Sequence, residues 1–136
     1  MKFEDVMTSE VKTCRPEQSL AAAATLMWEY DCGALPVVNE ANQVLGMITD
    51  RDIAIAVGTR GRCAAEIPIR EVISGQIITA SLDEDVHTAL RRMRHEKVRR
   101  IPITNGKGML QGILSINDIV LRAEEEKGRR HPELTY

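Results

Sequence analysis

The sequence is poor in aromatic residues and in net charge, and each shortage excludes a class of protein. One Phe, one Trp and two Tyr make up 3% of the 136 residues, so a core must be built from aliphatic side chains. The formal net charge of −2 provides no field that attracts nucleic acid. Uncharged stretches such as Ser19–Trp28 are too short to cross a bilayer. Acidic residues follow the first Met where a signal peptide needs an apolar segment, so we expect a cytoplasmic protein.

Cysteine is scarce as well, and its pattern gives no metal or disulfide framework. Cys14, Cys32 and Cys63 are odd in number, and no two of them have a C-x-x-C spacing. We interpret them as small apolar residues in a reducing compartment, and we expect no metal site. A Cys14–Cys32 disulfide or a redox sensor is the alternative interpretation.

What the sequence does contain is an internal repeat. The segment Val6–Gly58 aligns without a gap with Val72–Glu124, at a shift of 66 positions. Two copies of one unit predict a pseudo-two-fold arrangement with clefts between the copies. Each copy is too small to bury much surface alone, so we expect both to share one core. Identical pairs in this register include Thr13/Thr79, Met27/Met93, Pro36/Pro102, Asn39/Asn105, Gly46/Gly112 and Asp52/Asp118.

Hydrophobic spacing and turn residues predict the order β-α-β-β-α for each copy, which is an α+β fold class. Short helical turns precede the copies at Phe3–Met7 and Pro68–Ile73. The boundaries follow as residues 3–58 for the first copy, 59–71 for a connector, 72–127 for the second copy and 128–136 for a loose tail. The expected segments of the first copy are Val11–Cys14, Ser19–Tyr30, Leu35–Val38, Val44–Ile48 and a helix from Thr49 or Asp50 to about Val57. Those of the second copy are Ile77–Ala80, Asp83–Glu96, Ile101–Thr104, Met109–Leu114 and Ile116–Lys127.

One seven-residue motif occurs in both copies, as Gly46–Asp52 and Gly112–Asp118. Each reads glycine, two apolar residues, a hydroxyl residue, two variable residues and aspartate. In one interpretation the hydroxyl residue and the acid form a capping box that starts a helix. In the other, the carboxylate accepts hydrogen bonds from the vicinal hydroxyls of a ribose, and the helix N-terminus attracts phosphate. The occurrence of the motif twice in register favours the ligand.

These patterns together resemble the CBS domain, named after cystathionine β-synthase, which usually occurs as a tandem pair. The resemblance rests on Ala34–Val38 and Val44–Ile53 in the first copy and on Val98–Ile103 and Leu110–Ile119 in the second, and it covers about residues 3–124. It implies a stand-alone pair of the bacterial type. It also implies regulatory ligands that contain adenosine, namely AMP, ADP or ATP and sometimes NAD or S-adenosylmethionine, with no required cofactor.

The resemblance implies roles for individual residues. Asp52 and Asp118 would hold the ribose hydroxyls, and Thr49 and Ser115 would bond the ribose or a phosphate. The adenine would be framed by residues of the first strand and at the start of the second strand in each copy, which are Thr13, Leu35 and Pro36, then Thr79, Ile101 and Pro102.

Basic residues near the expected clefts differ between the copies. The second copy has Lys97, Arg99 and Arg100 where the first has no basic residue, and Arg51 occurs only in the first. Because the arginine fork donates two hydrogen bonds at once, we expect at least one of these arginines to meet a phosphate, and the clefts to bind unequally. An exposed strand edge or an ion pair with Glu96 is the alternative for Arg99 and Arg100.

The histidines, His87, His95 and His131, are scattered and form no catalytic set, so we do not expect an enzyme. We predict a regulatory module that binds an adenine nucleotide and controls an unknown protein partner. The resemblance implies a homodimer formed through helices, in which Trp28 and Tyr30 are either core residues or dimer contacts. The alternative function is a stress- or redox-responsive interaction module without a nucleotide ligand.

Overall fold

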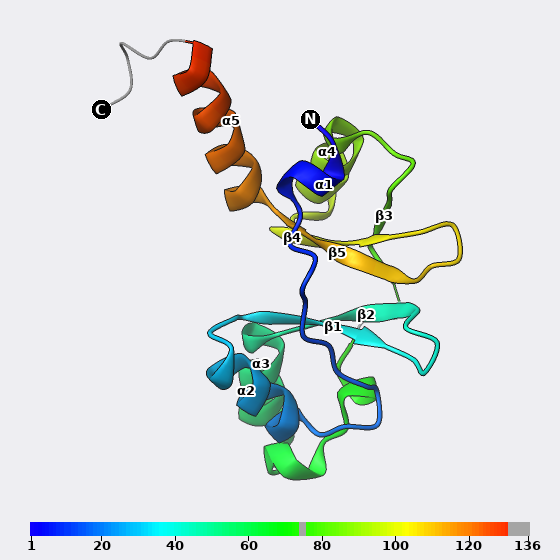
Figure 1. The fold of residues 1–136 in the computed structure, drawn as a ribbon. Coiled ribbons are helices and arrows are strands. Elements are labelled where there is room, and N and C mark those ends of the chain that lie inside the picture. The colour runs from blue at the N-terminus through cyan, green and yellow to red at the C-terminus, as the bar shows by residue number, and fades with distance from the viewer. Residues whose placement is uncertain (74–75, 131–136) are drawn as a thin grey trace.

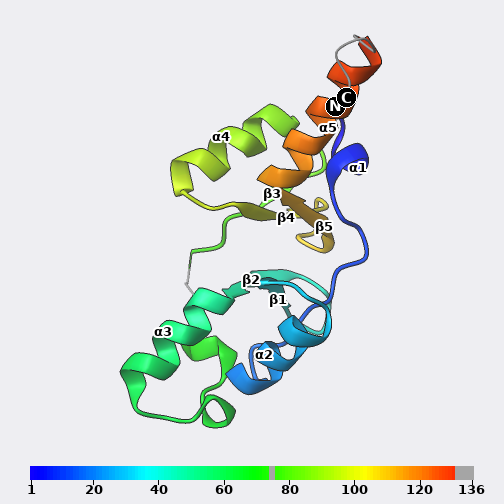
Figure 2. The ribbon, with the colours of Figure 1, turned by 90° about the vertical axis from the view of Figure 1, so that its left-hand side faces the viewer.

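The computed structural model describes residues 1–73 and 76–130, which form two halves stacked through their sheets (Figure 1). Helices cover the outer side of each sheet, so the layers run helix, sheet, sheet, helix (Figure 2). The predicted α+β fold of two repeated units is confirmed. The first half contains α2 (Leu20–Glu29), β1 (Ala34–Val38), β2 (Val44–Thr49), α3 (Asp50–Arg60) and the 3-10 turns η1 (Ala64–Glu66) and η2 (Ile69–Glu71). The second contains α1 (Phe3–Val6), β3 (Ala80–Ser81), α4 (Val86–Glu96), β4 (Arg100–Thr104), β5 (Leu110–Ser115) and α5 (Ile116–Arg130).

Both halves pair their strands in the same way. β1 and β2 form an antiparallel hairpin, as do β4 and β5, and each hairpin has a register shift near its turn. In the second half β3 joins β4 in parallel, with Ala80 opposite Ile103. The first half has the matching parallel bridge between Cys14 and Val37. The sequence repeat is therefore also a repeat of hydrogen-bond register.

The first predicted strand, Val11–Cys14, is wrong in length, because only Cys14 pairs with the sheet. Its N–H donates to the carbonyl of Pro36 at 3.0 Å, and its carbonyl accepts from the N–H of Val38 at 2.9 Å. Pro16 has no N–H and cannot extend the pairing beyond this point. The residues before Cys14 instead connect the two halves.

Side-chain caps determine where the long helices of each half begin. The Ser19 hydroxyl accepts from the N–H of Ala22 at 3.1 Å, and the Asp85 carboxylate accepts from the N–H of His87 at 3.0 Å. The helix predicted from Asp83 therefore begins three residues later. The last helix, predicted to end at Lys127, continues to Arg130, so it covers the first three residues of the predicted tail, and 131–136 lie outside the described residues. Within the described ranges, no helix is both long and apolar enough to cross a membrane.

The expected single core is wrong, because each half has its own buried cluster. Each buried cluster nevertheless includes side chains from the segment that precedes the other copy. Phe3 and Val6 of α1 are buried with residues of α4, β4 and α5 in the second half. Ile67 and Ile69, next to η1 and in η2, are buried with residues of α2, β1 and β2 in the first half. The helical turn that precedes each copy in the sequence thus packs into the core of the other copy.

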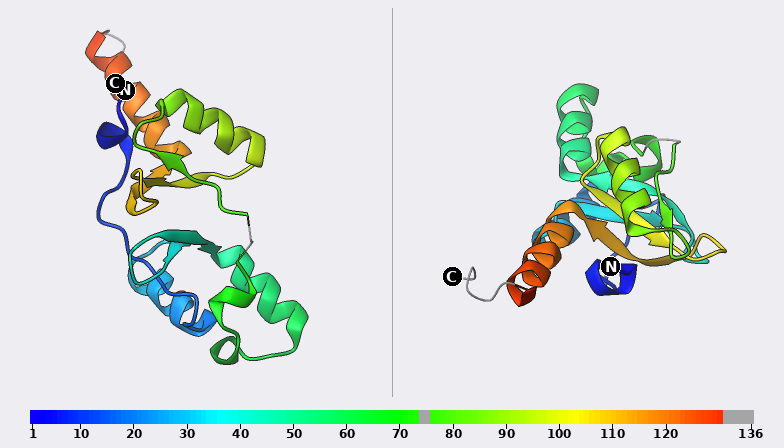
Figure 3. Two further views of the ribbon diagram at one scale, coloured as in Figure 1. Left: turned by 90° about the vertical axis from the view of Figure 1, so that its right-hand side faces the viewer. Right: turned by 90° about the horizontal axis from the view of Figure 1, so that it is seen from above.

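The N-terminal segment also links the halves through its backbone, on the opposite side from the segment that leads to β3 (Figure 3). Thr8 and Ile113 exchange two hydrogen bonds, of 2.8 and 2.9 Å. This approach requires glycine at the preceding position of β5, because a Cβ on Gly112 would lie 2.7 Å from the Thr8 carbonyl oxygen. At the hairpin turns, the N–H of Val44 donates to the carbonyl of Gly108 at 3.1 Å.

Candidate ligand-binding grooves

Two grooves lie between the facing sheets, and each contains one of the two motif aspartates. The Asp52 groove has a volume of about 440 Å³ and is lined by residues 49–52 together with residues 76–78 and 97–100. The Asp118 groove has a volume of about 730 Å³ and is lined by residues that include Ser115 and Asp118. The volumes fit small-molecule ligands.

Each groove is built from both copies. The Asp52 groove takes its aspartate from the first copy and the opposite wall, including Ile77 and Val98, from the second. The Asp118 groove takes its aspartate from the second copy and its wall, including Val11 and Cys32, from the first. These wall residues correspond at the 66-residue shift, so the grooves are related by the pseudo-two-fold axis.

The motif forms a complete capping box only in the first copy. The N–H of Thr49 donates to Asp52 Oδ2 at 2.9 Å, and the N–H of Asp52 donates to Thr49 Oγ1 at 3.1 Å. In the second copy, the N–H of Asp118 donates to Ser115 Oγ at 3.1 Å, and no described residue bonds the Asp118 carboxylate. The capping interpretation therefore applies fully to the first copy and only in part to the second. Asp52 is partly used by its helix, whereas both oxygens of Asp118 are free of partners among the described residues.

The grooves carry different charge. The Asp52 groove is lined by four cationic residues and two acidic ones, and the Asp118 groove by two of each. In the part of the chain that the structure describes, no ion pair involves Arg99 or Arg100, so the alternative pairing with Glu96 is not formed. The Asp52 groove is thus the more positive. Its cationic residues are Arg51, Lys97, Arg99 and Arg100, and those of the Asp118 groove are Lys12 and Arg100.

Lys12, which lines the Asp118 groove and not the Asp52 groove, already has a partner. The Lys12 ammonium lies 4.6 Å from the centre of the Tyr30 ring, a cation–π contact. Tyr30 is half exposed, and both residues line the groove. Tyr30 therefore contributes to a groove wall, a role that the sequence alone did not suggest.

Most of the sequence-predicted site residues line a groove. Thr13 and Pro36 line neither, and the Ile101 side chain is fully buried in the second core. Thr79 lies in a third, more open hollow beside α4, where its carbonyl accepts from Arg92 Nη1 at 2.6 Å. The residues of the set that line the Asp52 groove are Thr49, Arg51, Asp52, Arg99, Arg100 and Pro102, and those that line the Asp118 groove are Leu35, Arg100, Ser115 and Asp118.

Arg92 is held by Glu84, which fixes this edge of the second half. Its Nη2 lies 2.6 Å from Glu84 Oε2, and Glu84 Oε1 also accepts from the N–H of Ser81 at 2.9 Å. The hydrogen bond from Arg92 lowers the pKa of Glu84 below its usual value. The pair therefore joins α4 to the segment before it, and Arg92 also bonds the Thr79 carbonyl.

All three cysteines are free thiols, so the Cys14–Cys32 disulfide is not formed. Burial raises the pKa of the Cys14 thiol to about 12, which makes it a poor nucleophile. Cys32 is half-buried in the Asp118 groove, and Cys63 is exposed. Among the described residues, no group of three His, Cys, Asp or Glu side chains could hold a metal ion.

The family model of the CBS domain matches residues 3–58 and 69–125 of this chain. The chain therefore belongs to the CBS domain family and carries two copies of the domain. Among curated proteins, it is similar to the CBS domain-containing protein YhcV of Bacillus subtilis (strain 168). The two are 34% identical over 118 residues, which is 87% of this chain and 82% of that protein.

Solved structures share the fold over almost the whole chain. One is the CBS domain pair of protein MJ0100 in complex with 5-methylthioadenosine and S-adenosyl-L-methionine. It has a TM-score of 0.82 and 24% identity, and the match covers 93% of this chain and 98% of that one. Another is CBSX2 in complex with AMP, with a TM-score of 0.77 and 22% identity over 93% of this chain and 98% of that one. At these identities the likeness establishes the fold.

Proposed function

We propose that this protein is a regulatory sensor that binds adenosine-containing nucleotides, namely AMP, ADP, ATP or NAD, in the two grooves between its CBS repeats. The occupied form would favour a different packing of the pair, and an unidentified protein partner would respond to it. The observation that carries the proposal is the pair of symmetry-related grooves. Each contains an aspartate and a hydroxyl residue at a helix N-terminus, next to cationic side chains.

The chemistry of the grooves supports a nucleoside with phosphates. A carboxylate with free oxygens accepts hydrogen bonds from the vicinal hydroxyls of a ribose, and Asp118 meets this requirement. Apolar wall residues such as Ile77, Ile78 and Val98 offer a surface for a flat ring in the Asp52 groove. The free guanidinium groups suit phosphate oxygens. The ligands of MJ0100 and CBSX2 named above contain adenosine, which is consistent with this class.

The proposal predicts binding that titration calorimetry can measure. AMP, ADP, ATP and NAD are titrated into the purified protein, with ribose 5-phosphate and inorganic triphosphate as controls that lack the base or the nucleoside. We expect saturable heat with at least one adenine nucleotide and not with the controls. At 100 times its dissociation constant, that nucleotide should add about 2.7 kcal/mol to the free energy of unfolding. No heat and no rise in melting temperature with any of the four at millimolar concentration would contradict the proposal.

We also propose that the protein forms a homodimer through its outer helices. Apolar side chains on these helices are strongly exposed in the single chain, with Trp28 of α2 86% exposed, Ile55 of α3 51% and Leu121 of α5 58%. Large apolar side chains exposed on the outer helices are candidates for an association surface. Sedimentation equilibrium should give twice the mass of the chain, and Trp28→Glu or Leu121→Glu should shift the protein toward the monomer. A single-chain mass at high micromolar concentration would contradict the dimer.

A further inference from the structure

The two grooves meet at one position of the pseudo-two-fold arrangement. Among the described residues that line them, only Ala34 and Arg100 line both. These two residues correspond to each other at the 66-residue shift, so the meeting point lies on the symmetry axis. The sequence breaks the symmetry there, because one copy supplies a methyl group and the other a guanidinium.

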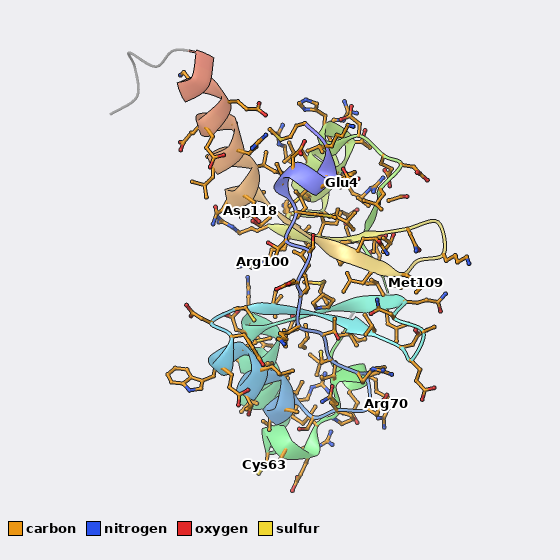
Figure 4. The ribbon with its side chains drawn as sticks, in the orientation of Figure 1. Glu4, Cys63, Arg70, Arg100, Met109 and Asp118 are labelled. Atoms are coloured by element: carbon orange, nitrogen blue, oxygen red, sulfur yellow. The ribbon has the colours of Figure 1, made fainter. Side chains whose placement is uncertain are left out.

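The guanidinium of Arg100 is available to a ligand in either groove. Arg100 is the first residue of β4, and its side chain is exposed on the side of the second half that faces the first (Figure 4). No described residue forms a hydrogen bond or an ion pair with this side chain. A long, unpartnered arginine can turn toward one groove or the other at little cost.

The two grooves do not depend on Arg100 to the same extent. The Asp52 groove has three further cationic residues, Arg51, Lys97 and Arg99. Besides Arg100, the one cationic residue in the described lining of the Asp118 groove is Lys12, whose ammonium lies over the Tyr30 ring. A phosphate in the Asp118 groove would therefore rely on Arg100, whereas one in the Asp52 groove has alternatives.

We propose that Arg100 is a phosphate ligand shared by both grooves, and that it couples them negatively. A phosphorylated ligand in the Asp52 groove draws Arg100 to itself and places negative charge at the meeting point. The Asp118 groove then loses its free guanidinium and faces that charge, so its affinity for a phosphorylated ligand falls. By thermodynamic linkage, occupancy of the Asp118 groove lowers the affinity of the Asp52 groove by the same factor. This inference rests on the proposed nucleotide binding and specifies how the two sites communicate.

The test compares AMP binding to the Asp118 groove when the Asp52 groove is empty and when it is filled. Asp52→Asn keeps an oxygen that can cap the helix but weakens the Asp52 groove for ribose, so titration of this variant gives the affinity of the Asp118 groove alone. The second binding step of the wild-type protein gives the affinity with both grooves filled. We expect the second value to be weaker by about tenfold, within the range typical of site coupling. Adenosine, which has no phosphate, should show no such difference.

Arg100→Ala and Arg99→Ala form a matched pair of variants, because Arg99 lines only the Asp52 groove. Arg100→Ala should abolish the tenfold difference and weaken AMP binding in the Asp118 groove. Arg99→Ala should weaken the Asp52 groove and leave the coupling in place. Independent binding of AMP to both grooves of the wild-type protein would overturn the coupling and leave the proposed function intact. Coupling that persists in Arg100→Ala, or that adenosine shows equally, would overturn the role of Arg100. No binding of AMP to the wild-type protein or to any variant would overturn the shared role of Arg100, and the titrations with ADP, ATP and NAD would then decide the proposed function.

Discussion

Replacing Asp118 by alanine should weaken nucleotide binding in the Asp118 groove by about 100-fold and leave the unliganded protein almost as stable as before. Two hydrogen bonds from ribose hydroxyls to a carboxylate are together worth about 3 kcal/mol, which corresponds to that factor. The cap of α5 survives because it uses the Asp118 backbone N–H and the Ser115 hydroxyl. Calorimetry with AMP and urea unfolding of the free protein measure the two effects separately.

The matched variant is Asp52→Ala, which should have two effects instead of one. It removes a ribose acceptor from the Asp52 groove and also breaks the bond from the Thr49 N–H to Asp52 Oδ2. We expect the free protein to lose about 1 kcal/mol of unfolding free energy, the value of a capping hydrogen bond. Unchanged AMP affinity in both variants would show that neither carboxylate binds the nucleotide. An equal loss of stability in both would contradict the difference between the two caps.

The second large effect concerns the exchanged helical turn α1. Phe3→Ala should lower the free energy of unfolding by about 3–5 kcal/mol, because it leaves a cavity in the core of the second half. Phe3 is 3% exposed and packs with Met93, Ile101 and Leu114 in one cluster. For a chain of this length the melting temperature should fall by roughly 10–15 °C.

Glu4→Ala is the control for this prediction, since Glu4 lies in the same turn but is exposed (Figure 4). It should change the unfolding free energy by no more than about 0.5 kcal/mol. Urea unfolding of both variants without ligand is the measurement. A loss below 1 kcal/mol in Phe3→Ala would mean that α1 does not pack against the second half in solution.

Much of this architecture could be predicted because its signals are local. Alternating apolar residues, the turn at Asn39 and its repeat at Asn105, and the glycine of each motif act over a few positions. The fold and the family follow from their order. The motif aspartates could be found in the same way, because a hydroxyl residue and an acid three positions apart mark a helix start regardless of the rest of the chain.

The partnership between the copies could not be predicted, and the reason is the repeat itself. The 66-residue repeat looks the same whether each motif aspartate faces residues of its own copy or residues of the other copy. The sequence is therefore equally consistent with two kinds of groove. In one, the wall opposite the aspartate comes from the same copy, and in the other it comes from the second copy. Ile77 and Ile78 were missed for this reason. The resemblance also assigned to the grooves four residues that line neither of them, which are Thr13, Pro36, Thr79 and Ile101. The difference between the caps of Asp52 and Asp118 depends on side-chain rotamers, which the motif does not specify.

Because the helical turn before each copy packs into the core of the other, neither repeat on its own contains all the side chains of its core. Phe3 precedes the first copy and its core partner Ile119 lies late in the second copy, so the core of the second half is complete only after both copies have been synthesised. A gene cut in the connector before Ile67 would yield two fragments, and each fragment would lack two buried side chains of its own core. The N-terminal fragment would carry Phe3 and Val6, which belong to the core of the second half. The C-terminal fragment would carry Ile67 and Ile69, which belong to the core of the first half. Only the reunited fragments hold the full set of buried side chains.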